Sequence, residues 1–81
     1  MKGVALTERK RMVLWRLAHD WWLVRTGKDG FGGAMGRQRR PRTASVSVSD
    51  MTSLMYDHEA IRWEPAIDEF VLTDEGRNLA K

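Results

Sequence analysis

The chain of 81 residues contains no cysteine, only two prolines and no long hydrophobic run. Without cysteine it can form no disulfide, and most zinc-finger ligand sets are excluded as well. The longest apolar run, Trp21–Val24, is far shorter than the roughly 18–20 residues that a membrane-spanning helix needs. The first residues also lack the apolar stretch of a secretory signal. We therefore expect a soluble, cytoplasmic protein that does not act on membranes.

Negative charge is scarce in the first half of the chain, and positive charge is scarce in the second half. Residues 1–42 hold eleven basic and three acidic residues, a net charge of +8, whereas residues 43–81 hold three basic and eight acidic residues, a net charge of −5. A chain of this length forms one domain, here residues 1–81, with a small core. Charge sorted in this way reports on partners rather than on fold. It predicts a protein that meets a charged macromolecule with one of its faces.

A helix is expected from Thr7 to Asp20. Thr7 can cap its first turn, and Glu8 places an acid at its positive end. Apolar residues then recur at three- and four-residue steps, as on one face of a helix: Leu14, Leu17, Ala18 and Trp21. The bulky run 21–25 permits either a longer helix or the start of a strand.

A segment rich in glycine and arginine, residues 26–43, is expected to be a flexible loop. Loops longer than about 12–15 residues are usually functional or disordered, so this one is the main candidate for contact with a partner. The basic residues that would make the contact are Arg25, Lys28, Arg37, Arg39, Arg40 and Arg42. A solvated loop, contact with nucleic acid and docking on an acidic protein surface all remain open. Arg9, Lys10 and Arg11 form a secondary basic patch if the helix start lies beside the loop.

The second half predicts a short strand, a helix, a hairpin and a final short helix. Residues 44–49 alternate as a strand does, and Ser49–Asp50 can equally cap a helix that ends near residues 57–58. Residues 60–63 and 69–72 are expected to form two strands joined by a turn that contains proline. Thr73 then caps the final helix.

The order helix, loop, helix, hairpin is that of a winged-helix domain, and four segments carry the resemblance. Phe70–Leu79 resembles the passage from the wing to the last helix in many bacterial winged-helix proteins, which often closes on a Leu-Thr-x-x-Gly-Arg pattern. Ser47–Met55 is similar to their third helix, Ala60–Trp63 to their first wing strand and Thr7–Arg11 to the start of their first helix. The resemblance implies a single α+β, winged-helix-like domain. It would have a long first helix, a Gly/Arg-rich loop, a second helix, a two-stranded wing hairpin and a short C-terminal helix.

The chain departs from the winged-helix pattern at two places. No second helix is visible, because residues 27–42 occupy its position. The helix that would read the major groove, residues 50–59, holds three acids and neither arginine nor lysine. Duplex DNA is densely negative and would repel such a helix. The resemblance therefore supports the fold and weakens sequence-specific DNA reading as the function.

The acids of the second half form a candidate docking face for a basic groove of a partner, although a solvated surface explains them as well. They are Asp50, Asp57, Glu59, Glu64, Asp68 and Glu69. Core packing accounts for most of the four tryptophans. Trp21 and Trp22 are adjacent and cannot both point the same way on a helix, so Trp22 is the candidate for an exposed or dimer-forming aromatic residue.

The sequence contains no motif that predicts a catalysed reaction. His19 and His58 are the only histidines, and they lie in separate elements without the spacing of metal ligands. The glycines match neither a phosphate-binding loop nor a dinucleotide-binding turn. Nothing resembles a nucleophile beside an orienting base. We therefore expect no catalysis, no cofactor and no metal.

Two functions remain. The first is a non-enzymatic modulator that binds a host protein or nucleoprotein complex; the second is a winged-helix transcriptional regulator that binds DNA. In size and style, though in no particular residue, the chain is similar to small phage-encoded or mobile-element-encoded inhibitors of host defence, including the anti-CRISPR proteins that block target binding by CRISPR complexes. The acidic helix favours the modulator. A homodimer remains open.

Overall fold

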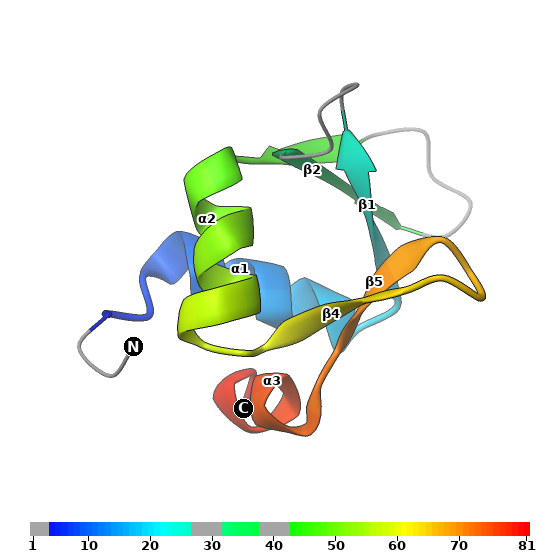
Figure 1. Cartoon of the computed structure of the whole chain (residues 1–81). Helices are drawn as coiled ribbons and strands as arrows, with labels where there is room; N and C mark the ends of the chain where they lie inside the picture. Colours follow the sequence, from blue (N-terminus) through cyan, green and yellow to red (C-terminus); the bar gives the residue numbers. More distant parts are fainter. Residues whose placement is uncertain (1–3, 27–31, 38–42) are drawn as a thin grey trace.

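The computed structural model describes residues 4–26, 32–37 and 43–81. Helices α1 and α2 lie on one side, a three-stranded sheet stands opposite them, and the hairpin and the last helix close the remaining side (Figure 1). The elements follow one another as α1 (Glu8–Leu17), β1 (Trp21–Thr26), β2 (Gly32–Arg37), β3 (Thr43–Val46), α2 (Val48–Thr52), the π-helix η1 (Ser53–Asp57), β4 (Ile61–Glu64), β5 (Glu69–Leu72) and α3 (Asp74–Leu79).

The expected first helix is confirmed, but it ends three residues early. The Thr7 hydroxyl accepts a hydrogen bond from the Lys10 amide at 3.3 Å, which caps the first turn as predicted. The chain leaves α1 after Leu17, and Asp20 adopts a left-handed φ of 67°. Aspartate tolerates this conformation better than most residues, so it allows the chain to reverse into β1.

The expectation of one long loop over residues 26–43 is wrong, because β2 lies inside it. β1, β2 and β3 form an antiparallel meander in the order β1-β2-β3. Trp22 of β1 lies opposite Gly36 of β2, and a Cβ atom at Gly36 would collide with the indole ring of Trp22. The glycine is therefore required at this place, since the ring lies across the strand where a side chain would otherwise stand.

The second half of the chain follows the expected order closely. The Ser47 hydroxyl caps α2 by accepting from the Asp50 amide at 3.2 Å. The helix then widens into η1, where the His58 amide donates to the Ser53 carbonyl at 3.0 Å. β4 and β5 form the expected hairpin, and Thr73 caps α3 as predicted.

Every strand, α1 and the α2–η1 helix contribute to one core. Its buried apolar residues are Val13, Leu14, Leu23, Met35, Val46, Met51, Leu54, Ala60, Ile61 and Phe70. α3 is held against it by Gly76, which packs on the backbone of Ala60, and by the partly buried Leu79. The Cα radius of gyration, 11.7 Å, is that of a compact domain of this length.

The fold is a small α+β domain, but its order is not that of a typical winged helix. A three-stranded meander, β1 to β3, stands between the first helix and α2, where a winged-helix domain would place its second helix. From α2 onward the order helix, hairpin, short helix is as expected. Among the described residues, no helix is long and apolar enough to cross a membrane.

Candidate interaction site

Helix α1 has an outer face that the other described residues leave exposed. Glu8 lies three and four residues before Arg11 and Met12, and these lie four and three residues before Trp15, which places all four on one side of the helix. Met12 and Trp15 are each 46% exposed, although both are large and apolar. With Glu8 and Arg11 they line a shallow hollow of about 260 Å³. We call these four residues the α1 face.

Trp15 is held in place by the turn that follows α1. The His19 ring stacks on the indole with a centroid separation of 4.1 Å and an interplanar angle of 19°. His19 Nδ1 lies 2.7 Å from the Trp15 carbonyl oxygen, which can only accept, so Nδ1–H is the donor. One side of the exposed indole is therefore fixed, which lowers the entropy that Trp15 would lose on binding a partner.

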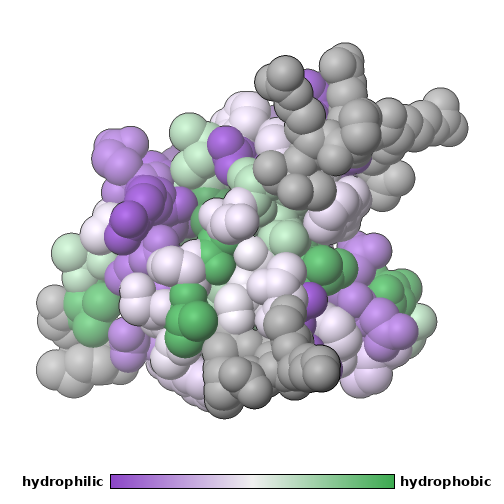
Figure 2. Space-filling view, turned by 90° about the horizontal axis from the view of Figure 1, so that it is seen from above, coloured by the Kyte–Doolittle hydropathy of each residue, from purple (hydrophilic) through white to green (hydrophobic). Residues whose placement is uncertain are grey.

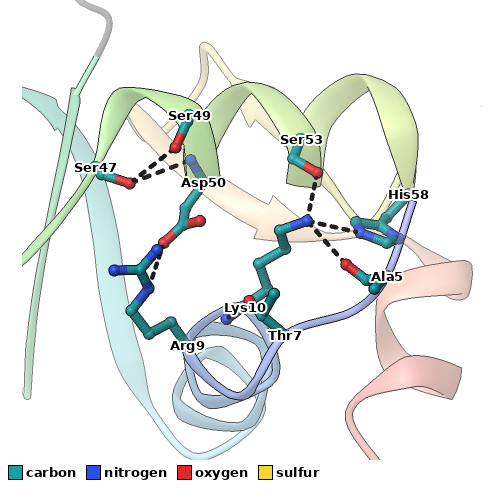
Figure 3. A network of polar contacts seen from close by, with 9 residues as sticks. All are labelled: Ala5, Thr7, Arg9, Lys10, Ser47, Ser49, Asp50, Ser53 and His58. Carbon is teal, nitrogen blue, oxygen red and sulfur yellow. Dashed lines mark hydrogen bonds and ion pairs between the residues drawn. The ribbon is translucent and has the colours of Figure 1, made fainter.

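The opposite, inward side of α1 carries a buried lysine (Figure 3). Lys10 is 7% exposed, and its Nζ donates to Ser53 Oγ at 2.8 Å, to the Ala5 carbonyl at 3.0 Å and to His58 Nε2 at 3.4 Å. An ammonium group has three protons, so all three are used. The partners are neutral dipoles, and no carboxylate of the described residues forms an ion pair with this buried charge.

Lys10, Ser53 and His58 also invite a catalytic interpretation, because an amine within hydrogen-bond reach of a hydroxyl can act as its base. Access argues against it. Ser53 is only 8% exposed, and three surface pockets that border α1 are all lined by other residues. We interpret the cluster as a latch that joins the start of α1 and the preceding segment to η1. It places the α1 face relative to the rest of the fold.

A second polar contact supports the same crossing of helices. Arg9 Nε lies 3.4 Å from Asp50 Oδ2, and Asp50 is buried while the Arg9 side chain is 78% exposed. Figure 3 shows Arg9 and Lys10, adjacent on α1, both reaching toward the α2–η1 helix.

The secondary basic patch expected from Arg9, Lys10 and Arg11 is therefore wrong for Lys10, which points into the protein. Arg9 is exposed but paired with Asp50, and only Arg11 belongs to the outer face. The reason is the helical rotation of about 100° per residue, which sends three consecutive side chains in three directions.

Of the basic residues expected to contact a partner, Lys28, Arg39, Arg40 and Arg42 lie outside the described residues. Arg25 and Arg37 are exposed on β1 and β2. The Arg25 guanidinium lies 4.5 Å from the centroid of the Trp63 ring, so it bridges the three-stranded sheet and the hairpin by a cation–π contact. Arg37 ends β2 opposite Trp21.

The acids expected to form one docking face are dispersed. Asp50 is buried and paired with Arg9, so it cannot take part. Glu64 accepts a hydrogen bond from Arg62 at 2.8 Å, and this bond, helped by the Ala66 amide, holds the pKa of Glu64 below its ordinary value. The others are at least partly exposed and lie at the end of η1, just after it or on the hairpin: Asp57, Glu59, Asp68 and Glu69.

The aromatic residue that the structure exposes is not the one that the sequence suggested. Trp22 is half-buried against Gly36, whereas Trp15 stands out from α1. The signal that would have found Trp15 is its step of three residues from Met12, with the buried Val13 and Leu14 between them on the other side of the helix. The sequence predicts most of the four tryptophans in the core, because tryptophan is so often buried, and it singles out Trp22 rather than Trp15 as the exposed one.

The surface over β2 and the start of α2 is mixed in character. Seen from above the view of Figure 1, hydrophilic residues gather at the left and again at the right, and separate hydrophobic spots lie among paler residues (Figure 2). Within the described ranges, no group of three or more histidine, aspartate or glutamate side chains is arranged to hold a metal ion. The α1 face is therefore the candidate on which apolar, aromatic and basic groups come together.

Comparisons with models of known protein families, with curated proteins and with solved structures find no match for this chain.

Proposed function

We propose that this protein is a non-enzymatic modulator that binds another protein through the α1 face. The observation that carries the proposal is the joint exposure of Trp15 and Met12 beside Arg11. Tryptophan, methionine and arginine are enriched at protein interfaces, and tryptophan and arginine dominate the residues that carry binding energy. The partner surface that fits is an apolar hollow with acidic residues at its rim.

The wider class of partner that we propose is a nucleic-acid-handling complex of a host cell, as for inhibitors of the anti-CRISPR type. What supports this is the uneven charge of the chain. A complex that holds nucleic acid offers both basic grooves and acidic protein surfaces. Basic residues of α1 would meet the acidic surface of the complex. The partly exposed Asp57 and the exposed Glu59 and Asp68 would face its basic groove.

A photo-crosslinking experiment tests the proposal. A benzophenone amino acid replaces Trp15, and a matched variant carries it in place of Ile67, a 54% exposed apolar residue at the hairpin turn. Irradiation in a host-cell lysate should give a discrete adduct from position 15 and none from position 67. The adduct should be sensitive to protease and resistant to nuclease. An adduct that nuclease removes, or equal adducts from both positions, contradicts the proposal.

Once the partner is identified, Trp15→Ala should weaken binding about thirtyfold, the effect of losing an interface anchor worth about 2 kcal/mol. Ile67→Ala should change the affinity by less than about twofold. Titration calorimetry with the purified partner measures both variants, and circular dichroism checks that each remains folded.

The winged-helix DNA regulator stays as a second proposal because Asp50 is turned inward. The outward side of α2 and η1 then presents Ser49, Thr52 and Tyr56, all neutral hydroxyl groups that could donate to phosphates. The order of α2, hairpin and α3 also supports the resemblance. Binding of a duplex of about 20 base pairs at low salt, falling steeply as salt rises, is the expected result. No shift of the duplex at low salt removes this alternative.

A further inference from the structure

A groove runs between α1 and the edge of the three-stranded sheet. It has a volume of about 420 Å³. One wall is α1, which contributes Arg9, Met12, Val13 and Arg16, and the other wall is the end of β3 and the start of α2, which contribute Ser45, Val46, Ser47 and Asp50. Val13 and Val46 are buried. Met12 lines both this groove and the hollow of the α1 face, so the two adjoin.

The strand that forms one wall is an edge strand. β3 pairs with β2 on one side only, since the sheet order is β1-β2-β3. Within the described part of the chain, the backbone of Thr43–Val46 makes no hydrogen bond to any element other than β2. The free edge of such a strand presents amide and carbonyl groups to which an extended peptide can add as a further strand.

The charge at the groove favours an acidic occupant. Arg9 is already paired with Asp50 at one end. Arg16 is partly exposed, has no carboxylate within ion-pair distance among the described residues, and lies over the Trp21 ring at 4.5 Å. The groove therefore holds one uncompensated guanidinium beside an apolar floor. A carboxylate two residues from an apolar side chain, on the same face of an extended segment, would satisfy both features.

We propose that this groove binds an extended acidic segment of the protein partner, which adds as a fourth strand to β3 and directs a carboxylate to Arg16. This rests on the proposed protein-binding function and names the chemistry of the partner. β3 is four residues long, so about four residues of the segment, roughly 13 Å, can pair with it. Alternate side chains of the added strand point to opposite faces of the sheet, and those on the α1 side fill the space over Val13 and Val46.

Duplex nucleic acid fits this groove less well. The buried Asp50 carboxylate lines it and would repel a phosphate, and the floor is apolar. A peptide brings apolar side chains for the floor together with an acid for Arg16. The two occupants can also be separated by experiment, because only the peptide depends on backbone hydrogen bonds to β3.

The test uses the full chain, labelled with ¹⁵N, and a capped synthetic hexapeptide, Thr-Val-Thr-Glu-Thr-Val, in which valine and glutamate share one face of the extended chain. Titration should shift the amide signals of residues 44–47 and 9–16, and leave those of β5 and α3 in place. A peptide with lysine in place of glutamate should bind about tenfold more weakly or worse. Absence of binding by the acidic peptide overturns the proposal.

Backbone N-methylation of the peptide distinguishes strand addition from simple charge attraction. Two methylated peptides are compared, one carrying N-methyl groups on its odd-numbered residues and the other on its even-numbered residues. One of them should lose binding and the other should keep its Kd within about threefold, because only alternate residues of an added strand bond to the edge. Equal binding by the two methylated peptides contradicts strand addition. Tighter binding of a short DNA duplex at the same amides would assign the groove to nucleic acid and overturn the peptide proposal.

Four substitutions complete the test. Arg16→Glu should weaken the acidic peptide about tenfold, Arg16→Lys should largely retain it, and Lys81→Glu, the matched charge reversal outside the groove, should have little effect. Trp15 does not line the groove, so Trp15→Ala should leave peptide binding unchanged. Peptide binding without crosslinking at position 15 would refute the α1 face alone. Crosslinking without peptide binding would refute the groove alone.

Discussion

Removing the Ser53 hydroxyl deprives the buried Lys10 ammonium of its shortest hydrogen bond, 2.8 Å. A hydrogen bond to a charged group contributes about 1.5–3 kcal/mol, and a buried charge that loses a partner cannot regain water at no cost. Alanine is a better helix former than serine by about 0.5 kcal/mol, which offsets part of the loss. We expect Ser53→Ala to lower the free energy of unfolding by about 1.5–2 kcal/mol. For a domain of this size that is a fall in Tm of roughly 10 °C.

The decisive measurement is a double-mutant cycle with Lys10→Met, which keeps an unbranched side chain of similar length and removes the charge. In that background Ser53→Ala should cost almost nothing, because the hydroxyl no longer faces an ammonium. The coupling free energy between the two positions should therefore be about 2 kcal/mol. Lys10→Met alone is a poor test, because its two effects on the free energy of unfolding oppose each other. It removes hydrogen bonds that stabilise the fold, and it also removes a buried charge whose desolvation is unfavourable.

Urea unfolding followed by tryptophan fluorescence measures all four corners of the cycle. Ser49→Ala is the matched control: it makes the same change in the same helix, at an exposed serine whose hydroxyl, among the described residues, hydrogen-bonds only to the Ser47 hydroxyl, at 3.4 Å. Its effect should stay within about 0.5 kcal/mol. If Ser53→Ala is no more costly than Ser49→Ala, or equally costly with and without Lys10, the latch does not stabilise the fold and the reasoning fails.

Three further outcomes follow from particular contacts. Glu59 has a left-handed φ of 50°, so Glu59→Gly should raise the free energy of unfolding by about 0.5–1 kcal/mol in a urea titration, and a loss of stability would contradict backbone strain there. Gly76→Ala should lower it by about 1–3 kcal/mol, because the added methyl group would overlap the Ala60 carbonyl; an unchanged Tm would show that α3 can shift freely. The Glu64 carboxyl should titrate by NMR below its ordinary pKa of 4.5, and Arg62→Gln should raise that midpoint, since the hydrogen bond from Arg62 is the main cause of the lowered pKa. Because this pKa is lowered on folding, the contribution of Glu64 to stability is present above pH 4.5 and is lost as the pH falls below it.

Elements whose signals are local could be predicted from the sequence. The hydroxyl of Thr7 and that of Thr73 both cap helices in the structure, and each is followed by an acid in the first turn. The hairpin was recognisable because Pro65 marks a turn between two runs rich in β-formers, and Asp68 closes it in the left-handed conformation. These features depend on residues within a few positions of each other.

Strand β2 could not be predicted in this way. Three of its six residues are glycine, the residue type that strands disfavour most together with proline. Its stability comes from β1 on one side, β3 on the other and the ring of Trp22 across Gly36. None of these neighbours is visible in a local window, so composition alone indicated a loop.

The candidate site depended on tertiary placement for the same reason. The sequence predicted one basic patch from Arg9, Lys10 and Arg11, because nothing in it says which face of α1 the α2–η1 helix covers. The side of α1 that carries Lys10 is buried because Lys10 contacts Ser53, which is 43 residues away in the chain. Exposure of Trp15 is the consequence on the other side, because a helix packed through one face leaves the opposite face in solvent.

The uneven charge of the chain acts partly within the fold. Arg9 and Lys10 come from the positive half, and both make polar contacts with the negative half, at Asp50 and Ser53. Burial weakens solvent screening of such contacts, so they favour the packing of α1 against α2 and η1. These cations are then much less available to a partner than the net charge of the first 42 residues suggests. On α1, the positive charge left for recognition is that of Arg11 and Arg16. Because each of them lies beside an apolar hollow or groove, the surface suits an acidic protein segment that carries apolar side chains better than it suits bare phosphates.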